Sequence, residues 1–166
     1  MDFIFIVGVG RSGTSLLQSM FAAHSQIAFA PETAFLRRYV ASGTIPGEHG
    51  RKDPRALADM VAADENFQRT ALDAGELVQR VLENGNLNNG AVYREMLSAL
   101  ADRQKKPVAG DKDPRSVEFL GLVLRVLGNC HVVHVLRDPR DVLASKKKAE
   151  WSRGRGILPV TARNPD

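Results

Sequence analysis

The chain of 166 residues, 43% hydrophobic and 25% charged, has the composition of one globular domain and not of a disordered protein. Its net charge of +4 lies in residues 130–166, which suits a polyanionic ligand, although the lysines at 146–148 could equally form the solvated end of a helix. Aromatic residues make up only 6% of the chain and do not alternate with basic ones, so we expect no nucleic-acid partner.

The first expected elements are a strand, a glycine-rich turn and a helix. Residues 3–7 form a continuous run of β-branched and aromatic side chains, typical of a buried strand in a parallel sheet. This run is far too short for a signal sequence or a membrane span, so we expect a cytoplasmic protein without a membrane-spanning segment. A helix is predicted over 14–23 from apolar residues at helical spacing. Its apolar face consists of Leu16, Leu17, Met20 and Phe21.

The turn between this strand and this helix has the G-x4-G spacing of a phosphate-binding P-loop. Its glycines allow backbone N–H groups to turn toward an anion, and the following helix adds the positive end of its dipole. Thr14 stands where a phosphate-transferring loop has lysine, which argues against an ordinary ATPase or kinase. We therefore expect no metal, although Asp111 is left open as a metal ligand. The residues predicted to bind an oxyanion are Gly10, Arg11, Ser12, Gly13, Thr14 and Ser15.

A helical insert is expected in the middle of the chain, over about 41–103. Residues 27–30 predict a short second strand, with Glu32 just past its carboxyl end and a short helix over 35–40. Glycines and prolines mark a loop over 41–54. Periodic apolar residues then predict helices at 55–63, 75–84 and 90–103. Such an insert resembles a substrate-binding layer.

The last third of the chain is predicted to return to strands. Residues 107–110 form a weak strand candidate before Asp111-Lys112-Asp113-Pro114, and 131–136 form a clear one. Helices are expected over 117–127 and 139–148. The single cysteine, Cys130, is expected to be a buried thiol in a reducing compartment. These elements predict an α/β, P-loop-containing three-layer fold with a central parallel sheet and the helical insert.

Two segments resemble sulfotransferases that use 3′-phosphoadenosine-5′-phosphosulfate. Arg-Ser-Gly-Thr-Ser-Leu-Leu at 11–17 resembles the loop that binds the 5′-phosphosulfate in cytosolic, Golgi and bacterial members. Residues 135–145 resemble the segment that binds the 3′-phosphate, including the eight-residue step from Arg137 to Ser145. The resemblance implies transfer of a sulfuryl group from this co-substrate to a hydroxyl or amine acceptor, without a metal.

The resemblance also gives roles to three further side chains. Glu32 is similar to the catalytic base of the tyrosylprotein-type branch, Arg11 would hold the phosphosulfate, and Lys112 would face the donor's bridging oxygen. From the residues alone, Glu32 could be a solvated residue at a helix start. Lys112 could equally pair with Asp111 or Asp113 at a turn.

Other residues leave alternatives open. Arg137 could bind a phosphate through two N–H groups, or could pair with Asp138 or Asp141. His131 and His134 are three residues apart in a strand, so at most one can point toward a given site, and neither suits the base as well as Glu32. Trp151 could pack on the adenine or close the core.

Compared with the resembled family, nothing after Gly154 supplies the expected glycine-rich, lysine-containing segment. We therefore expect a single, incomplete domain over 1–166, with an uncovered sheet edge that favours self-association. The rival functions are a P-loop kinase that uses ATP and a non-catalytic nucleotide- or anion-binding module. The acceptor is left open among a tyrosine, a sugar hydroxyl, a lipid headgroup and a small phenol.

Overall fold

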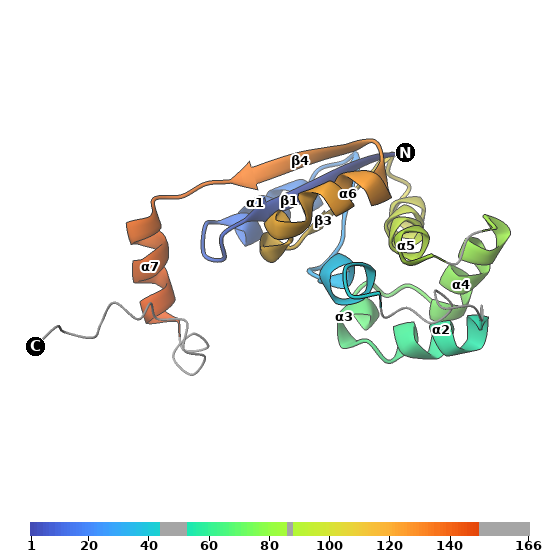
Figure 1. The fold of residues 1–166 in the computed structure, drawn as a ribbon. Coiled ribbons are helices and arrows are strands. Elements are labelled where there is room, and N and C mark those ends of the chain that lie inside the picture. The colour runs from blue at the N-terminus through green and yellow to red at the C-terminus, as the bar shows by residue number, and fades with distance from the viewer. Residues whose placement is uncertain (44–52, 86–87, 150–166) are drawn as a thin grey trace, which may run out of the picture.

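The computed structural model describes residues 1–43, 53–85 and 88–149, and its centre is a sheet of four parallel strands (Figure 1). The strands are β1 (Asp2–Gly8), β2 (Ile27–Phe29), β3 (Val108–Lys112) and β4 (Cys130–Val135). Their order in the sheet is β2-β3-β1-β4, and each neighbouring pair is parallel. The predicted α/β class with a central parallel sheet is confirmed.

Helices cover both faces of this sheet. Phe5 of β1 points into the larger core, which includes side chains of α5 (Asn89–Gln104) and α6 (Leu120–Leu127). The next residue, Ile6, points to the other face, where α1 (Thr14–Ala22) contributes Leu17 and Phe21. This alternation follows from the two-residue period of a strand. The three layers predicted from the sequence are therefore present.

The described chain has four α-helices between β2 and β3, after the π-helical turn η1 (Leu36–Val40). They are α2 (Pro54–Ala62), α3 (Glu65–Gln68), α4 (Ala74–Glu83) and α5. Oxygen-bearing side chains cap their first turns, as Asp53, Asp73 and Asn88 do for α2, α4 and α5. Helix α5 lies between the sheet and α4 (Figure 1). Residues 44–52 of the expected loop, and residues 86–87 between the helices expected at 75–84 and 90–103, lie outside the described residues.

Helix α1 forms where expected, and its apolar face of four residues is only partly covered. Leu17 and Phe21 pack against the sheet, whereas Leu16 and Met20 are 70% and 64% exposed. The four residues occupy two neighbouring rows of the helix surface, and only one row faces the strands.

Strand β3 extends two residues beyond the expected strand and ends at Lys112. A 3-10 helix, η2 (Pro114–Phe119), follows, and α6 comes directly after it. The single helix expected over 117–127 is therefore divided between two elements. Asp113 starts η2 because its side chain accepts from the backbone N–H of Arg115. A side-chain carbon at Gly110 would lie 2.4 Å from the ring of Phe29, so the glycine allows β2 to pack closely.

Strand β4 is the last strand of the described sheet and pairs with β1. Leu136, which follows it, is 79% exposed. Helix α7 (Pro139–Lys148) then begins at the Asp138 cap and stands apart from the body of the molecule (Figure 1). Self-association through this edge stays a prediction. Within the described ranges, no helix is long and apolar enough to cross a bilayer.

Candidate active site

The glycine-rich turn places the start of α1 at the carboxyl end of the sheet. A side-chain carbon at Gly8 would lie 2.6 Å from the carbonyl oxygen of Val135, so only glycine lets β1 and β4 approach there. Arg11 adopts the left-handed conformation with φ 78°, and Gly13 precedes α1 with φ 98°. No side chain of the described residues caps this helix. Its first N–H groups are therefore available to an anion.

Two distant segments meet at this turn. The guanidinium of Arg137 donates to the carbonyl oxygen of Arg11 at 3.2 Å, and Arg11 Nε donates to Ser145 Oγ at 3.0 Å. A cavity of about 220 Å³, here called the loop cavity, lies between them. Its lining residues are Arg11, Gly13, Thr14, Ser15, Arg137 and Ser145. The structure thus brings most of the predicted oxyanion-binding residues together around one cavity, with two arginines in its wall.

Of the two readings of Arg137 from the sequence, the structure shows the one in which it pairs with Asp141. Its Nε lies 3.8 Å from a carboxylate oxygen of Asp141, an exposed pair one helical turn apart. The adjacent Arg140 instead pairs with Asp138, at 2.6 Å from Nη2 to Oδ2. Because the contact to Asp141 is long and solvated, it contributes little and leaves Arg137 able to bind a phosphate.

Lys112 meets Glu32 at the next point along the same edge of the sheet. The ammonium of Lys112 forms an ion pair with Glu32 and lies 3.3 Å from Ser15 Oγ. The side chain of Lys112 is 2% exposed, whereas that of Glu32 is 43% exposed. The alternative that Lys112 pairs with Asp111 or Asp113 is wrong, because successive side chains of β3 point to opposite faces and Lys112 points toward α1.

A second cavity, of about 520 Å³, opens beside this ion pair and is here called the Glu32 cavity. Its lining residues are Ser15, Gln18, Ser19, Pro31, Glu32, Ala34, Asn66, Arg69 and Lys112. Asn66 lies in the short helix α3 and Arg69 ends it, and neither was singled out from the sequence. Helix α3 has only four residues, too few to show a periodic pattern. The one local signal for it in the sequence is Asp64, a residue type that often precedes the first turn of a helix.

A buried hydrogen-bonded group lies behind Lys112, on the opposite face of the sheet. Asp111 is 1% exposed and accepts hydrogen bonds from the hydroxyls of Tyr93, at 2.8 Å, and Thr33, at 3.3 Å. Burial raises the pKa of Asp111 to about 7, an effect that the hydrogen bonds only partly offset. Among the described residues, no group of three or more acidic, histidine or cysteine side chains could hold a metal ion.

The other residues singled out from the sequence lie elsewhere. His131 and His134 are both exposed on β4. Cys130 is half-buried rather than fully buried, and its burial raises the thiol pKa to about 11. Trp151 lies outside the described residues.

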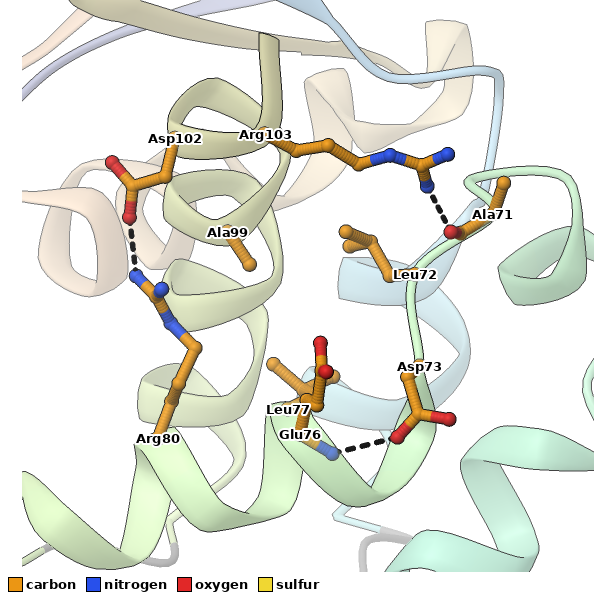
Figure 2. Close-up of a pocket in the computed structure, with 9 residues that line it drawn as sticks. All are labelled: Ala71, Leu72, Asp73, Glu76, Leu77, Arg80, Ala99, Asp102 and Arg103. Atoms are coloured by element: carbon orange, nitrogen blue, oxygen red, sulfur yellow. Dashed lines mark hydrogen bonds and ion pairs between the residues drawn. The ribbon is translucent and has the colours of Figure 1, made fainter. Parts of the chain in front are cut away.

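A third cavity, of about 370 Å³, lies between α4, α5 and the segment before α4 (Figure 2). Figure 2 shows Arg80 bonded to Asp102, and Arg103 bonded to the carbonyl oxygen of Ala71. Both arginines in its wall are thus bonded within the chain. This cavity shares no lining residue with the loop cavity or the Glu32 cavity.

The fold is an α/β domain in which the glycine-rich turn and two arginines line one cavity. A model described as "Sulfotransferase family" matches residues 2–158, nearly the whole chain, and the chain belongs to this family. An uncharacterized protein of Aquifex aeolicus (strain VF5) is 24% identical over 155 residues. That match covers 93% of this chain but 18% of the Aquifex protein, so the chain spans less than a fifth of this relative's length.

Proposed function

We propose that this chain transfers a sulfuryl group from 3′-phosphoadenosine-5′-phosphosulfate to a hydroxyl of a polar acceptor. One observation carries the proposal: the loop cavity and the Glu32 cavity share Ser15, and the ion pair of Lys112 and Glu32 lies at their junction. A donor on one side and an acceptor on the other would meet beside a cation and a carboxylate. Membership of the sulfotransferase family supports sulfuryl transfer as the general reaction.

The loop cavity is suited to the donor. Arg11 and the N–H groups at the start of α1 would hold the 5′-phosphosulfate, because a helix N-terminus and a guanidinium both favour an oxyanion. Arg137 and Ser145 would hold the 3′-phosphate. In the structure Arg11 Nε donates to Ser145 Oγ. A bound phosphate would replace the serine hydroxyl as the acceptor of that hydrogen bond.

The chemistry requires one bond to form, one to break and one proton to move. The acceptor oxygen forms a bond to sulfur, the bridging S–O bond breaks, and its electron pair stays on the phosphate oxygen. Glu32 would take the acceptor's proton as general base. Lys112 would stabilise the negative charge that develops on the leaving phosphate.

The lining of the Glu32 cavity favours a hydrophilic acceptor. Apart from Pro31 and Ala34, every residue in its wall is polar or charged, and none is aromatic. A phenol is usually bound between apolar or aromatic walls. A sugar-like hydroxyl therefore suits this cavity better than a small phenol does.

A test of the proposal is transfer of radiolabelled sulfate from the donor to a panel of methyl glycosides and p-nitrophenol. We expect labelled glycosides, and a fall of at least about a hundredfold in Glu32→Gln, since general-base catalysis contributes that much. The control Glu83→Gln changes an exposed glutamate, which accepts a hydrogen bond from Gln79 at 3.1 Å, and should be silent. Donor binding with equal, background turnover in both variants would instead indicate the non-catalytic module.

One observation favours the rival kinase. Lys112 supplies an ammonium near the loop, from β3, where the loop itself has Thr14 in place of lysine. A kinase would transfer labelled phosphate from ATP with magnesium to the same panel and would make no sulfate ester. Running both labelled donors side by side separates the two reactions.

A further inference from the structure

The segment after β2 contacts the end of β3 from both faces of the sheet. Asp111 and Lys112 are consecutive, so their side chains point to opposite faces. Lys112 meets Glu32 on the α1 side, whereas Asp111 accepts from Thr33 Oγ1 on the α5 side. Glu32 and Thr33 are consecutive too. Two neighbouring residues of this segment therefore bind two neighbouring residues of the strand.

The carboxylate of Asp111 is surrounded by hydrogen-bond donors. Its Oδ2 accepts from Tyr93 and Thr33, and its Oδ1 accepts from the backbone N–H of Lys112 at 2.7 Å. The Thr33 hydroxyl also accepts from the backbone N–H of Phe35 at 3.2 Å. That bond spans Ala34, which has φ 52°. A non-glycine residue keeps such a conformation only where its surroundings hold it, and here Thr33 anchored on Asp111 does so.

We propose that Asp111 is a positioning residue: its buried carboxylate holds Thr33 and thereby fixes Glu32 beside Lys112 and the Glu32 cavity. The inference rests on the proposed function, in which Glu32 accepts the proton of the acceptor. Glu32 itself is 43% exposed and lies in an irregular segment, so its position depends on how its backbone is anchored. The Thr33–Asp111 bond is the buried anchor next to it.

The same bond makes the site sensitive to pH. A neutral carboxyl accepts more weakly than a charged carboxylate, so protonation of Asp111 weakens the hydrogen bonds that Thr33 and Tyr93 donate to it. Burial is the main cause that raises the pKa of Asp111 to about 7, and the charge of Asp113 adds to it. Asp113 in turn pairs with Arg37 at 3.1 Å. Tyr93 from α5 and Thr33 face Asp111 as neutral donors. Because protonation of Asp111 weakens its bond to Thr33, this anchor should weaken as the pH falls through about 7.

The test compares variants that remove the hydrogen bond between Thr33 and Asp111 with variants that keep it. Thr33→Val removes the anchoring hydroxyl at nearly constant volume, and Thr33→Ser retains it. Tyr93→Phe removes the other hydroxyl on the same carboxylate oxygen and leaves the Thr33–Asp111 bond in place. Asp111→Asn keeps the shape of the side chain but does not titrate.

Two readouts follow the position of Glu32 without a known acceptor. The first is the ¹H–¹⁵N signal of the Lys112 ammonium, which its burial and ion pair protect from exchange, assigned by its loss in Lys112→Met. The second is slow transfer of labelled sulfate from 3′-phosphoadenosine-5′-phosphosulfate to water. Affinity for adenosine 3′,5′-bisphosphate reports that the loop cavity is intact.

We expect Thr33→Val to broaden the ammonium signal and to slow transfer to water by about tenfold or more, as misplaced groups do. Bisphosphate affinity should change by less than about twofold, because no residue that lines the loop cavity is altered. Thr33→Ser should restore both readouts, and Tyr93→Phe should retain both despite lower stability. Wild-type transfer should fall as the pH is lowered through 7, and Asp111→Asn should lack this step.

Equal effects of Thr33→Val and Tyr93→Phe on the ammonium signal would overturn the inference, because both would then act only through stability. The persistence of the wild-type pH step in Asp111→Asn would overturn it as well. If the wild-type protein bound no bisphosphate, the proposed function would fail, and the ammonium signal would still decide whether Thr33 positions Glu32.

Discussion

The ammonium of Lys112 lies 3.3 Å from the hydroxyl of Ser15, so β3 brings a buried cation to the first turn of the helix that follows the glycine-rich loop. The side chain is 2% exposed, and Glu32 compensates its charge. An unpaired charge at this depth would be strongly unfavourable. The ion pair therefore keeps both a cation and a carboxylate at the junction of the two cavities.

Lys112→Met should slow sulfuryl transfer by about 10²- to 10³-fold, the usual effect of removing one group that stabilises developing charge. The variant should stay folded, because the carboxylate it leaves behind, Glu32, is 43% exposed and can be hydrated. Initial rates with labelled donor give the comparison. Lys106→Met is the matched control, since Lys106 bonds the carbonyl oxygen of Ile27, at the start of β2. An unchanged rate in Lys112→Met would remove Lys112 from the mechanism.

Two glycines of the loop should respond differently to alanine. Gly8→Ala would place a carbon 2.6 Å from the Val135 carbonyl oxygen, and separating β1 from β4 should lower the free energy of unfolding by about 1–3 kcal/mol. In Gly10→Ala the added carbon meets no atom within 4 Å, so the free energy of unfolding should change by less than about 0.5 kcal/mol. Urea unfolding curves measure both. Equal losses would mean that the strands do not meet at Gly8 as described.

The stability of the protein should depend on pH through Asp111. Its pKa is about 7 in the fold and 3.8 without it, so between these values the folded state binds the extra proton. Stability therefore falls as the pH rises from about 4 to 7, and ionisation of Asp111 is unfavourable to folding. Comparing pH 5 with pH 8, wild type should lose on the order of 2 kcal/mol relative to Asp111→Asn. A pH-independent difference between the two proteins would contradict the burial of an ionisable carboxyl there.

The sequence was sufficient to predict the strands and the glycine-rich loop, and the resemblance implied that Arg11 and Arg137 bind one co-substrate. Parallel strands end at the same edge of a sheet, so the residues that follow the strands gather along that edge once the strands are recognised. The positions of β1, β4 and α7 came from local patterns of apolar, glycine and proline residues. These signals are local and need no knowledge of packing.

Features that depend on packing between distant segments were not predictable in the same way. From the sequence, the alternative partner of Lys112 was a neighbouring aspartate, Asp111 or Asp113. In the structure, the alternation of side chains along β3 places Lys112 on the face where it pairs with Glu32 instead. Arg69 lines the Glu32 cavity only because the chain brings α3 and α1 to the same cavity, and no periodic pattern in a four-residue helix shows this. Leu16 fits the helix period but lies on a row that no described strand faces.

The most direct test of the account is calorimetric titration with adenosine 3′,5′-bisphosphate, beside ATP with magnesium, on the wild type and on Arg137→Ala. We expect bisphosphate to bind, ATP to bind much more weakly, and Arg137→Ala to lose about 1–3 kcal/mol of bisphosphate binding, as for a charged hydrogen-bond donor. Arg140→Ala is the control, because Arg140 is 89% exposed and bonds Asp138. Preferential binding of ATP, or equal bisphosphate affinity in Arg137→Ala and wild type, would contradict the assignment of the loop cavity to a sulfuryl donor.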